Sequence, residues 1–175
     1  MTKQNAIILS IAIAAGAAYI FTRRRSSEAQ TGDQIMEHDL AYDQSKRGYR
    51  NNNPLNIRIN PGNNWKGKIL ANTDGVFEQF ISMPYGFRAA LVLFRNYIRK
   101  GDNTLAKIVA KWAPPTENHT GIYTSFVANK TGIDPERVIK RSDAESLKLL
   151  AHAMAWYENG SAPQWTDIEE GWEMV

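Results

Sequence analysis

The chain has 175 residues, and its 21 Lys and Arg against 18 Asp and Glu give a formal net charge of +3. This length suffices for one globular domain with an appendage, and the small charge does not indicate a nucleic-acid partner. Because there is no cysteine, disulfides and thiol nucleophiles are excluded. The three histidines show no metal-ligand spacing with acidic residues, so we expect neither a metal site nor a cofactor.

The first element is an apolar run at residues 6–21, which only Ser10 interrupts and which three arginines at 23–25 follow. A helix of this length spans about 24 Å, slightly less than the ~30 Å hydrocarbon core, and the arginines can reach the membrane interface. A cleaved signal peptide needs basic residues ahead of the apolar run, where only Lys3 stands. We therefore expect residues 1–25 to form a single-pass transmembrane anchor with a basic flank.

Residues 26–46 are polar and lack apolar periodicity, so they are predicted to be a linker, and residues 47–175 are predicted to be one domain. After a turn-rich segment, two short strands are expected at 65–69 and 76–80, on either side of the turn signal Asp74-Gly75. With these strands and the helices that follow, the predicted fold class is α+β with helices dominating.

Five helices are expected in the second part of the domain from apolar periodicity and cap residues. Proline in a first turn opens one helix, glycines close three, and a Pro-Pro pair stops another. The expected helices begin at Ser82, Thr104, Thr120, Ser142 and Asp167, and they end near Gly101, Trp112, Gly132, Gly160 and Met174. Thr166 is the expected cap of the last helix.

Glu158 stands in an unusual place for a carboxylate. Ser142 and Glu145 form a capping-box pattern ahead of its helix, and Gly160 is suited to the left-handed end. The apolar stripe of this helix runs through positions 147, 150, 151 and 154 to Glu158. Burial and the helix dipole both favour the protonated form, as in a general acid; the alternative is a helix-end Glu that reaches into solvent.

Many residues of the domain match a known family in order along the chain. The matches are Arg47-Gly48-Tyr49-Arg50-Asn51-Asn52-Asn53-Pro54-Leu55-Asn56-Ile57-Arg58, Trp65, Gly67, Phe77, Phe80, Gly86-Phe87-Arg88-Ala89, Trp112-Ala113-Pro114-Pro115, Glu117-Asn118, Thr120, Tyr123 and Glu158-Asn159-Gly160. In these residues the chain resembles the phage virion-associated peptidoglycan hydrolases with a lysozyme-like fold, over about residues 47–173. The family usually has Gly in place of Leu55 and His in place of Tyr157.

A weaker resemblance links the domain to bacterial glucosaminidases and lytic transglycosylases. Their helix ending in Glu-Ser-Gly precedes an Asn-rich turn, a Trp-x-Gly motif, an aromatic strand and a long helix. Here the same pieces occur in order, except that the helix ending in Glu158-Asn159-Gly160 comes last. The resemblance therefore implies a circularly permuted lysozyme-like domain, which closely spaced domain termini make feasible.

The resemblance implies cleavage of a glycosidic bond, which requires a carboxylic acid beside the leaving oxygen. Glu158 is the candidate acid, and Glu117 is the second candidate, although a charged residue ahead of a helix also has a purely structural explanation. Amide and aromatic side chains suit a glycan groove, whereas the asparagines also suit turns and the helical spacing of Trp112 suits the core. The candidate substrate-binding residues are Asn52, Asn53, Asn56, Trp65, Asn118, Tyr123 and Asn159.

The expected function is therefore that of a membrane-anchored phage virion peptidoglycan hydrolase of muramidase, lytic transglycosylase or glucosaminidase type. The alternatives are an inactive virion structural protein that binds peptidoglycan or capsid proteins, and a signal-anchor endolysin for host lysis. The basic flank at 23–25 favours a cytoplasmic domain. A single-pass protein of a membrane inside the phage capsid reconciles this orientation with a cell-wall substrate.

Overall fold

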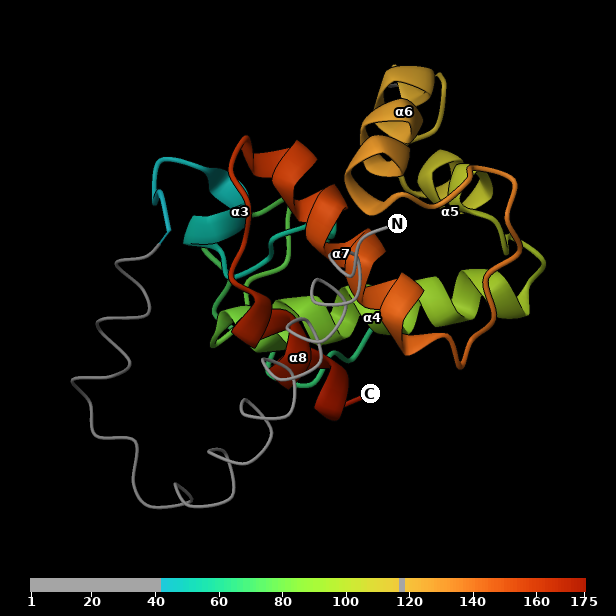
Figure 1. Cartoon of the computed structure of the whole chain (residues 1–175). Coiled ribbons are helices and arrows are strands. Elements are labelled where there is room, and N and C mark those ends of the chain that lie inside the picture. Colours follow the sequence, from blue (N-terminus) through green and yellow to red (C-terminus); the bar gives the residue numbers. More distant parts are fainter. Residues whose placement is uncertain (1–41, 117–118) are drawn as a thin grey trace, which may run out of the picture. The chain divides into compact units, whose positions relative to one another are not determined.

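Six helices make up the regular structure of residues 42–116 and 119–175, the part of the chain that the computed structural model describes (Figure 1). Residues Tyr42–Val175 cluster as one unit. The helices are α3 (Arg47–Arg50), α4 (Met83–Arg99), α5 (Leu105–Trp112), α6 (Thr120–Thr131), α7 (Ala144–Asn159) and α8 (Trp165–Glu173).

Helix α4 is the longest of these helices and packs against α8, α7 and α5. Its first turn contains Pro84, which lacks a backbone N–H. This costs nothing there, because N–H groups in the first turn make no hydrogen bond within the helix. The predicted apolar face is confirmed, since Phe87, Ala90, Leu91 and Phe94 are fully buried. This face supplies a large part of the core on which the other helices rest.

Helix α7 confirms the predicted apolar stripe and its left-handed end. Leu147, Leu150, Ala151 and Met154 are fully buried, and Gly160 has a φ of 77°. The capping box that was predicted from Ser142 and Glu145 is wrong. The N-cap is Asp143, whose carboxylate accepts from the Ser146 N–H at 3.1 Å, because a charged acceptor there also complements the helix dipole.

The remaining predicted helices are confirmed, with small changes at their ends. Thr104 caps α5 by accepting from the Lys107 N–H at 3.3 Å, and α6 ends at Gly132 with a φ of 69°. Helix α8 starts at Trp165, so the predicted Thr166 cap is wrong; Gln164 precedes the helix and makes no side-chain cap. Such differences of one or two residues are usual at helix ends.

The two predicted strands are wrong. In the described residues the segments 65–69 and 76–80 contain only isolated antiparallel bridges, which pair Lys68 with Phe80 and Arg58 with Phe77. Backbone hydrogen bonds still join these segments, including one from the Ile69 N–H to the Gln79 carbonyl at 2.8 Å. The residues 76–80 pair first with one segment and then with another, so no ladder becomes long enough to form a strand.

The predicted class, an α+β lysozyme-like domain behind one transmembrane helix, therefore requires correction. The described residues form a helical unit with no strand. None of the helices within 42–116 and 119–175 is long and apolar enough to cross a membrane. The apolar run at 6–21, where the transmembrane helix was predicted, lies outside the described residues.

Tyr42 joins the start of the described unit to its last helix. Its hydroxyl donates to the Asp167 carboxylate at 2.5 Å and accepts from the Gln164 N–H at 2.8 Å. The ring is buried, and its centroid lies 4.5 Å from the centroid of the Tyr49 ring. The same carboxylate and burial raise the pKa of the Tyr42 hydroxyl, so it remains a donor.

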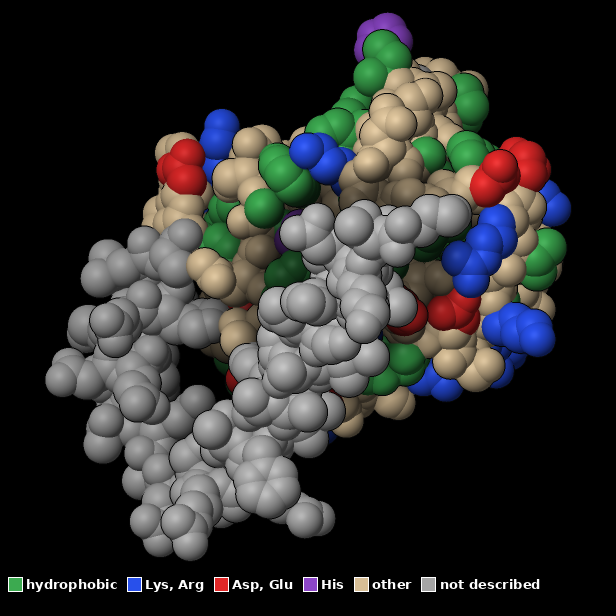
Figure 2. All heavy atoms as spheres, viewed as in Figure 1, with side chains coloured by type: hydrophobic (Ala, Val, Ile, Leu, Met, Phe, Trp, Pro, Cys, Tyr) green, Lys and Arg blue, Asp and Glu red, His purple; other side chains and the backbone are tan. Residues whose placement is uncertain are grey.

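Charged side chains of both signs are interspersed on the face of the unit that Figure 2 shows. Two surface pairs join Lys148 to Glu169 at 2.8 Å and Arg137 to Asp143 at 3.2 Å. Such exposed pairs contribute little to stability, so the apolar core described above carries most of it.

Gly86 tests the close packing of α4 on the loop after α3. A Cβ at Gly86 would lie 2.1 Å from the Asn52 carbonyl oxygen and 2.7 Å from Pro54, so Gly86→Ala forces backbone apart. We expect a loss of about 1–3 kcal/mol in the free energy of unfolding, although alanine is normally the better helix residue. Urea denaturation of the full chain measures this loss.

Gly121→Ala in α6 is the matched control, because a Cβ there meets nothing within 4 Å. We expect it to be neutral or to stabilise by up to about 1 kcal/mol. Equal effects of the two substitutions would contradict the close approach at Gly86.

Candidate functional site

Glu158 lies in the last turn of α7, where two other segments reach its carboxylate. The Asn56 side-chain amide donates to Oε2 at 3.0 Å, and the Tyr123 hydroxyl donates to Oε1 at 3.0 Å. Asn56 belongs to the loop after α3, and Tyr123 belongs to α6. The carboxylate therefore lies where three parts of the fold meet.

The pKa of Glu158 is raised above its ordinary value of 4.5, chiefly because the carboxyl is largely buried. The hydrogen bonds from Asn56 and Tyr123 act in the opposite direction, since they stabilise the ionised form. Burial also raises the pKa of Tyr123 well above 10, so its hydroxyl keeps its proton and donates. Burial thus favours the neutral form of the Glu158 carboxyl. Asn56 and Tyr123 are already in place to donate hydrogen bonds to its ionised form.

The loop that carries Asn56 is shaped by asparagines. Asn52 and Asn56 have φ values of 49° and 53°, a left-handed conformation that asparagine tolerates better than most residues. The Asn53 side chain is fully buried and bonds the Ile57 N–H, the Ile57 carbonyl and the Glu78 carbonyl, each at 2.9 Å. Asn53 therefore holds the loop from inside and does not reach the surface.

Asn159 joins the end of α7 to the same loop. Its side-chain amide is buried and donates to the Pro54 carbonyl at 2.7 Å and to the Ala155 carbonyl at 2.8 Å. Both amide hydrogens are used within the protein. Asn159 thus positions the neighbouring Glu158, and its side-chain N–H groups are not available for a substrate.

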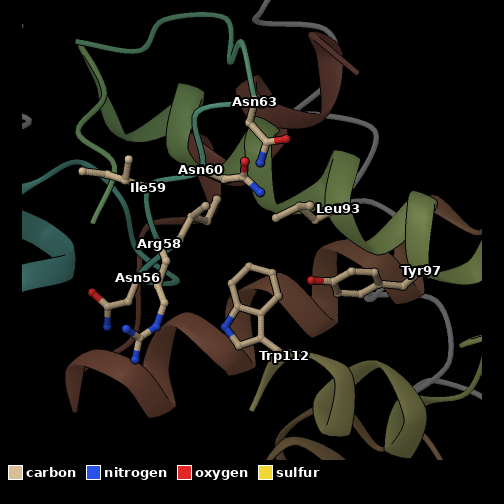
Figure 3. Close-up of a pocket in the computed structure, with 9 residues that line it drawn as sticks. Asn56, Arg58, Ile59, Asn60, Asn63, Leu93, Tyr97 and Trp112 are labelled. Carbon is tan, nitrogen blue, oxygen red and sulfur yellow. The ribbon is translucent and has the colours of Figure 1, made fainter. Parts of the chain in front are cut away.

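Two adjoining cavities open beside Glu158. The smaller, of about 220 Å³, has Glu158 in its wall, and the larger, of about 350 Å³, extends between the loop and helices α4 and α5 (Figure 3). Asn56, Arg58 and Trp112 line both cavities. Figure 3 shows the Arg58 side chain extending past Asn56 and the Tyr97 hydroxyl pointing toward Trp112. Because the two cavities share these three wall residues, we refer to them together as the groove.

Arg58 and Trp112 were missed as site residues. Trp112 is predicted to lie in the core, and its edge-to-face contacts agree with this: its ring centroid lies 5.5 Å from that of Phe94 and 6.4 Å from that of Tyr97. It also lines the groove. Arg58 was noted only as part of a matching motif. It lies two residues after Asn56, and the predicted role of Asn56 in the groove was the nearest signal for it.

Two of the other predicted site residues, Trp65 and Asn52, lie away from the two cavities. Trp65 packs against the core, and the Asn52 amide donates to the Phe80 carbonyl at 3.2 Å; neither lines the two cavities. Glu117 and Asn118 lie outside the described residues. Within the described part of the chain, no three His, Asp or Glu side chains are grouped so that they could hold a metal ion.

Glu78 is a second buried carboxylate, but it serves the fold. It is fully buried and pairs with Lys68 at 3.0 Å, and it lines neither cavity. Among the described residues that line the groove, Glu158 is therefore the only carboxylate.

Comparison with known proteins links the chain to a bacteriophage. It is 40% identical over 134 residues to Protein P5 of Pseudoalteromonas phage PM2, across 74% of this chain and 82% of that protein. The chain belongs to the family of this phage protein. No family model matches the chain. The name of the phage relative states no activity, so the resemblance to peptidoglycan hydrolases stays a prediction.

The raised pKa of Glu158 predicts a pH-dependent effect of Glu158→Gln on stability. The carboxyl resists ionisation in the folded state, so its contribution to the free energy of unfolding falls as the pH rises from 4.5 through the folded-state pKa. Glutamine does not titrate. Denaturation between about pH 4 and about pH 8 should therefore show the variant gaining stability relative to the wild type as the pH rises.

Glu145→Gln is the control, because Glu145 is an exposed carboxylate on the same helix. The change of stability with pH in Glu158→Gln is measured relative to this variant, which makes the same chemical change at an exposed position. A stability difference for Glu158→Gln that does not change with pH would contradict the raised pKa.

Tyr123→Phe removes one of the two donors to the Glu158 carboxylate. Because this hydrogen bond favours the ionised form, we expect its loss to raise the pKa of Glu158 further. A carbon-13 NMR titration of the Glu158 carboxyl, assigned with Glu158→Gln, measures the shift. Tyr49→Phe is the control, because the Tyr49 hydroxyl donates to the Ser161 carbonyl and not to Glu158. A lower or unchanged pKa of Glu158 in Tyr123→Phe would count against the hydrogen bond from Tyr123 to Glu158.

Proposed function

We propose that this chain is a phage virion enzyme that cleaves the glycan strand of peptidoglycan, with Glu158 as the general acid. The observation that carries the proposal is the environment of Glu158. A largely buried carboxyl with a raised pKa faces a groove lined by amide, guanidinium and indole groups. Sugars are bound by groups of these kinds, through hydrogen bonds to hydroxyl and N-acetyl groups and through packing on flat aromatic faces.

The proposed chemistry begins with transfer of the Glu158 proton to the glycosidic oxygen, because the sugar alkoxide is a poor leaving group without it. The transfer leaves Glu158 as a carboxylate. Asn56 and Tyr123 then stabilise this negative charge through donors that are already 3.0 Å away. The same two residues fix the orientation of the carboxyl before the reaction, which favours proton transfer along one direction.

The proposed reaction is of the lytic transglycosylase type, which needs only one carboxylate from the protein. Among the described residues that line the groove, only Glu158 is acidic. In a transglycosylase the substrate's own 6-hydroxyl oxygen attacks the anomeric carbon as the bond to the leaving oxygen breaks. Its proton returns to the Glu158 carboxylate, and the anhydro sugar that forms leaves the acid ready for another cycle.

The test compares release of soluble fragments from purified peptidoglycan by the full chain and by Glu158→Gln. We expect the variant to lose at least about 100-fold in rate, the usual scale of general acid catalysis. Glu145→Gln, an exposed change on the same helix, should retain the wild-type rate. Mass spectrometry of the fragments should show anhydro ends, which are lighter by one water than hydrolysed ends.

The alternative is a virion structural protein that binds peptidoglycan without turnover. Wild-type protein that co-sediments with peptidoglycan but releases no fragments would support this alternative. Full activity in Glu158→Gln would remove Glu158 from the mechanism.

A further inference from the structure

We infer that Arg58 is a specificity-determining residue, which binds a carboxylate carried by an N-acetylmuramic acid unit in the groove beside Glu158. This inference rests on the proposed function, since it takes the groove to be the glycan site. Through this contact Arg58 would distinguish the substrate from a neutral polymer of N-acetylglucosamine. The carboxylate is either that of the lactyl group in a strand without stem peptides or one carried by the stem peptide itself.

The first argument is the position of Arg58. It lines both cavities, together with Asn56 and Trp112, and it therefore lies where the acid-containing part of the groove meets the larger part. In Figure 3 its side chain extends from the loop past Asn56. A ligand that spans the two cavities would have to pass this guanidinium.

The second argument is that Arg58 has no acidic partner within the described part of the protein. None of the ion pairs between described residues includes it, although Glu158 lines the same cavity. Its guanidinium carbon lies 5.5 Å from the centre of the Phe77 ring. Arg58 is exposed, so this contact with an aromatic face favours the position of the side chain only weakly, and its N–H groups are available for a ligand.

The third argument is the charge of the groove. Among the described residues that line the two cavities, Arg58 is the only basic one and Glu158 the only acidic one. A general acid must be neutral when it acts, and in that state Arg58 is the one charged side chain among the described residues of the groove. An anionic substituent then gains a charge-assisted, bidentate partner, whereas a neutral sugar gains none.

The rest of the larger cavity suits the sugar that would carry this anion. The side-chain amides of Asn60 and Asn63 and the hydroxyl of Tyr97 provide donors and acceptors, and Leu93 and Trp112 provide apolar surface. This mixture fits an N-acetylated hexose, which has an acetamido group, hydroxyls and apolar ring faces. The volume of this larger cavity, about 350 Å³, is that of a small-ligand site.

The experiment measures binding in the absence of turnover, with the full chain carrying Glu158→Gln. Three tetrasaccharides of equal length serve as probes: a muramyl strand without stem peptides, a muramyl strand with stem peptides, and neutral chitotetraose. We expect Arg58→Gln to weaken binding of at least one muramyl strand by at least about tenfold, the scale of one hydrogen bond between charged groups. Binding of chitotetraose should change by less than about twofold, because it lacks a carboxylate.

The two muramyl probes identify the source of the carboxylate. A loss confined to the strand without stem peptides assigns the lactyl carboxylate, and a loss confined to the other assigns a carboxylate of the stem. Arg58→Lys keeps the charge without the planar fork and should give an intermediate loss. Arg141→Gln removes an exposed positive charge elsewhere and should leave all three affinities unchanged.

An equal loss for all three probes would overturn the inference, and so would unchanged binding of both muramyl strands or binding of none of the probes. Thermal denaturation of Arg58→Gln checks that the fold is retained. The proposed function fails separately: a chain that binds muramyl strands through Arg58 but releases no fragments from peptidoglycan would keep this inference and lose catalysis.

Discussion

The whole site depends on one buried amide, the side chain of Asn159. It connects the end of α7 to the Pro54 carbonyl, 105 residues earlier in the chain, and so sets the distance between Glu158 and the loop that carries Asn56. Gly48 packs so closely on this amide that a Cβ there would lie 2.4 Å from the Asn159 Oδ1. A shorter side chain at 159 would leave the Pro54 carbonyl buried without this donor, at a cost of about 1–3 kcal/mol. The position of the Glu158 carboxyl is thus set by the packing of the neighbouring residue, Asn159.

The environment of Glu158 combines two opposing influences. Burial disfavours the charge, while donors from Asn56 and Tyr123 favour it. A carboxyl in a purely apolar pocket would hold its proton too firmly to give it up, and one surrounded by donors would have lost it already. The balance needs groups from α6, α7 and the loop after α3, so it exists only once those elements have packed together.

The helices could be predicted because their signals are local: Pro84 and Thr104 at starts, Gly132 and Gly160 at ends, and apolar residues at helical spacing between them. The strands at 65–69 and 76–80 could not be judged in this way, because pairing depends on partners elsewhere in the chain. The site shows the same division. Glu158, Asn56 and Tyr123 were named individually, but hydrogen bonds across 102 and 35 residues have no local signal, and the position of Arg58 in the groove depends on where α5 places Trp112.

The hydrogen bond between Tyr42 and Asp167 has a mechanical consequence. Tyr42 is the first described residue, and it is attached to α8 through a buried hydroxyl, far along the chain from Glu158. A pulling force on the chain ahead of residue 42 would first load this bond and the ring contact with Tyr49. Because the Tyr49 hydroxyl donates to the Ser161 carbonyl just after α7, the load would pass next to the end of the helix that carries Glu158. Two tyrosines, Tyr42 and then Tyr49, therefore lie between a pulled chain and the groove.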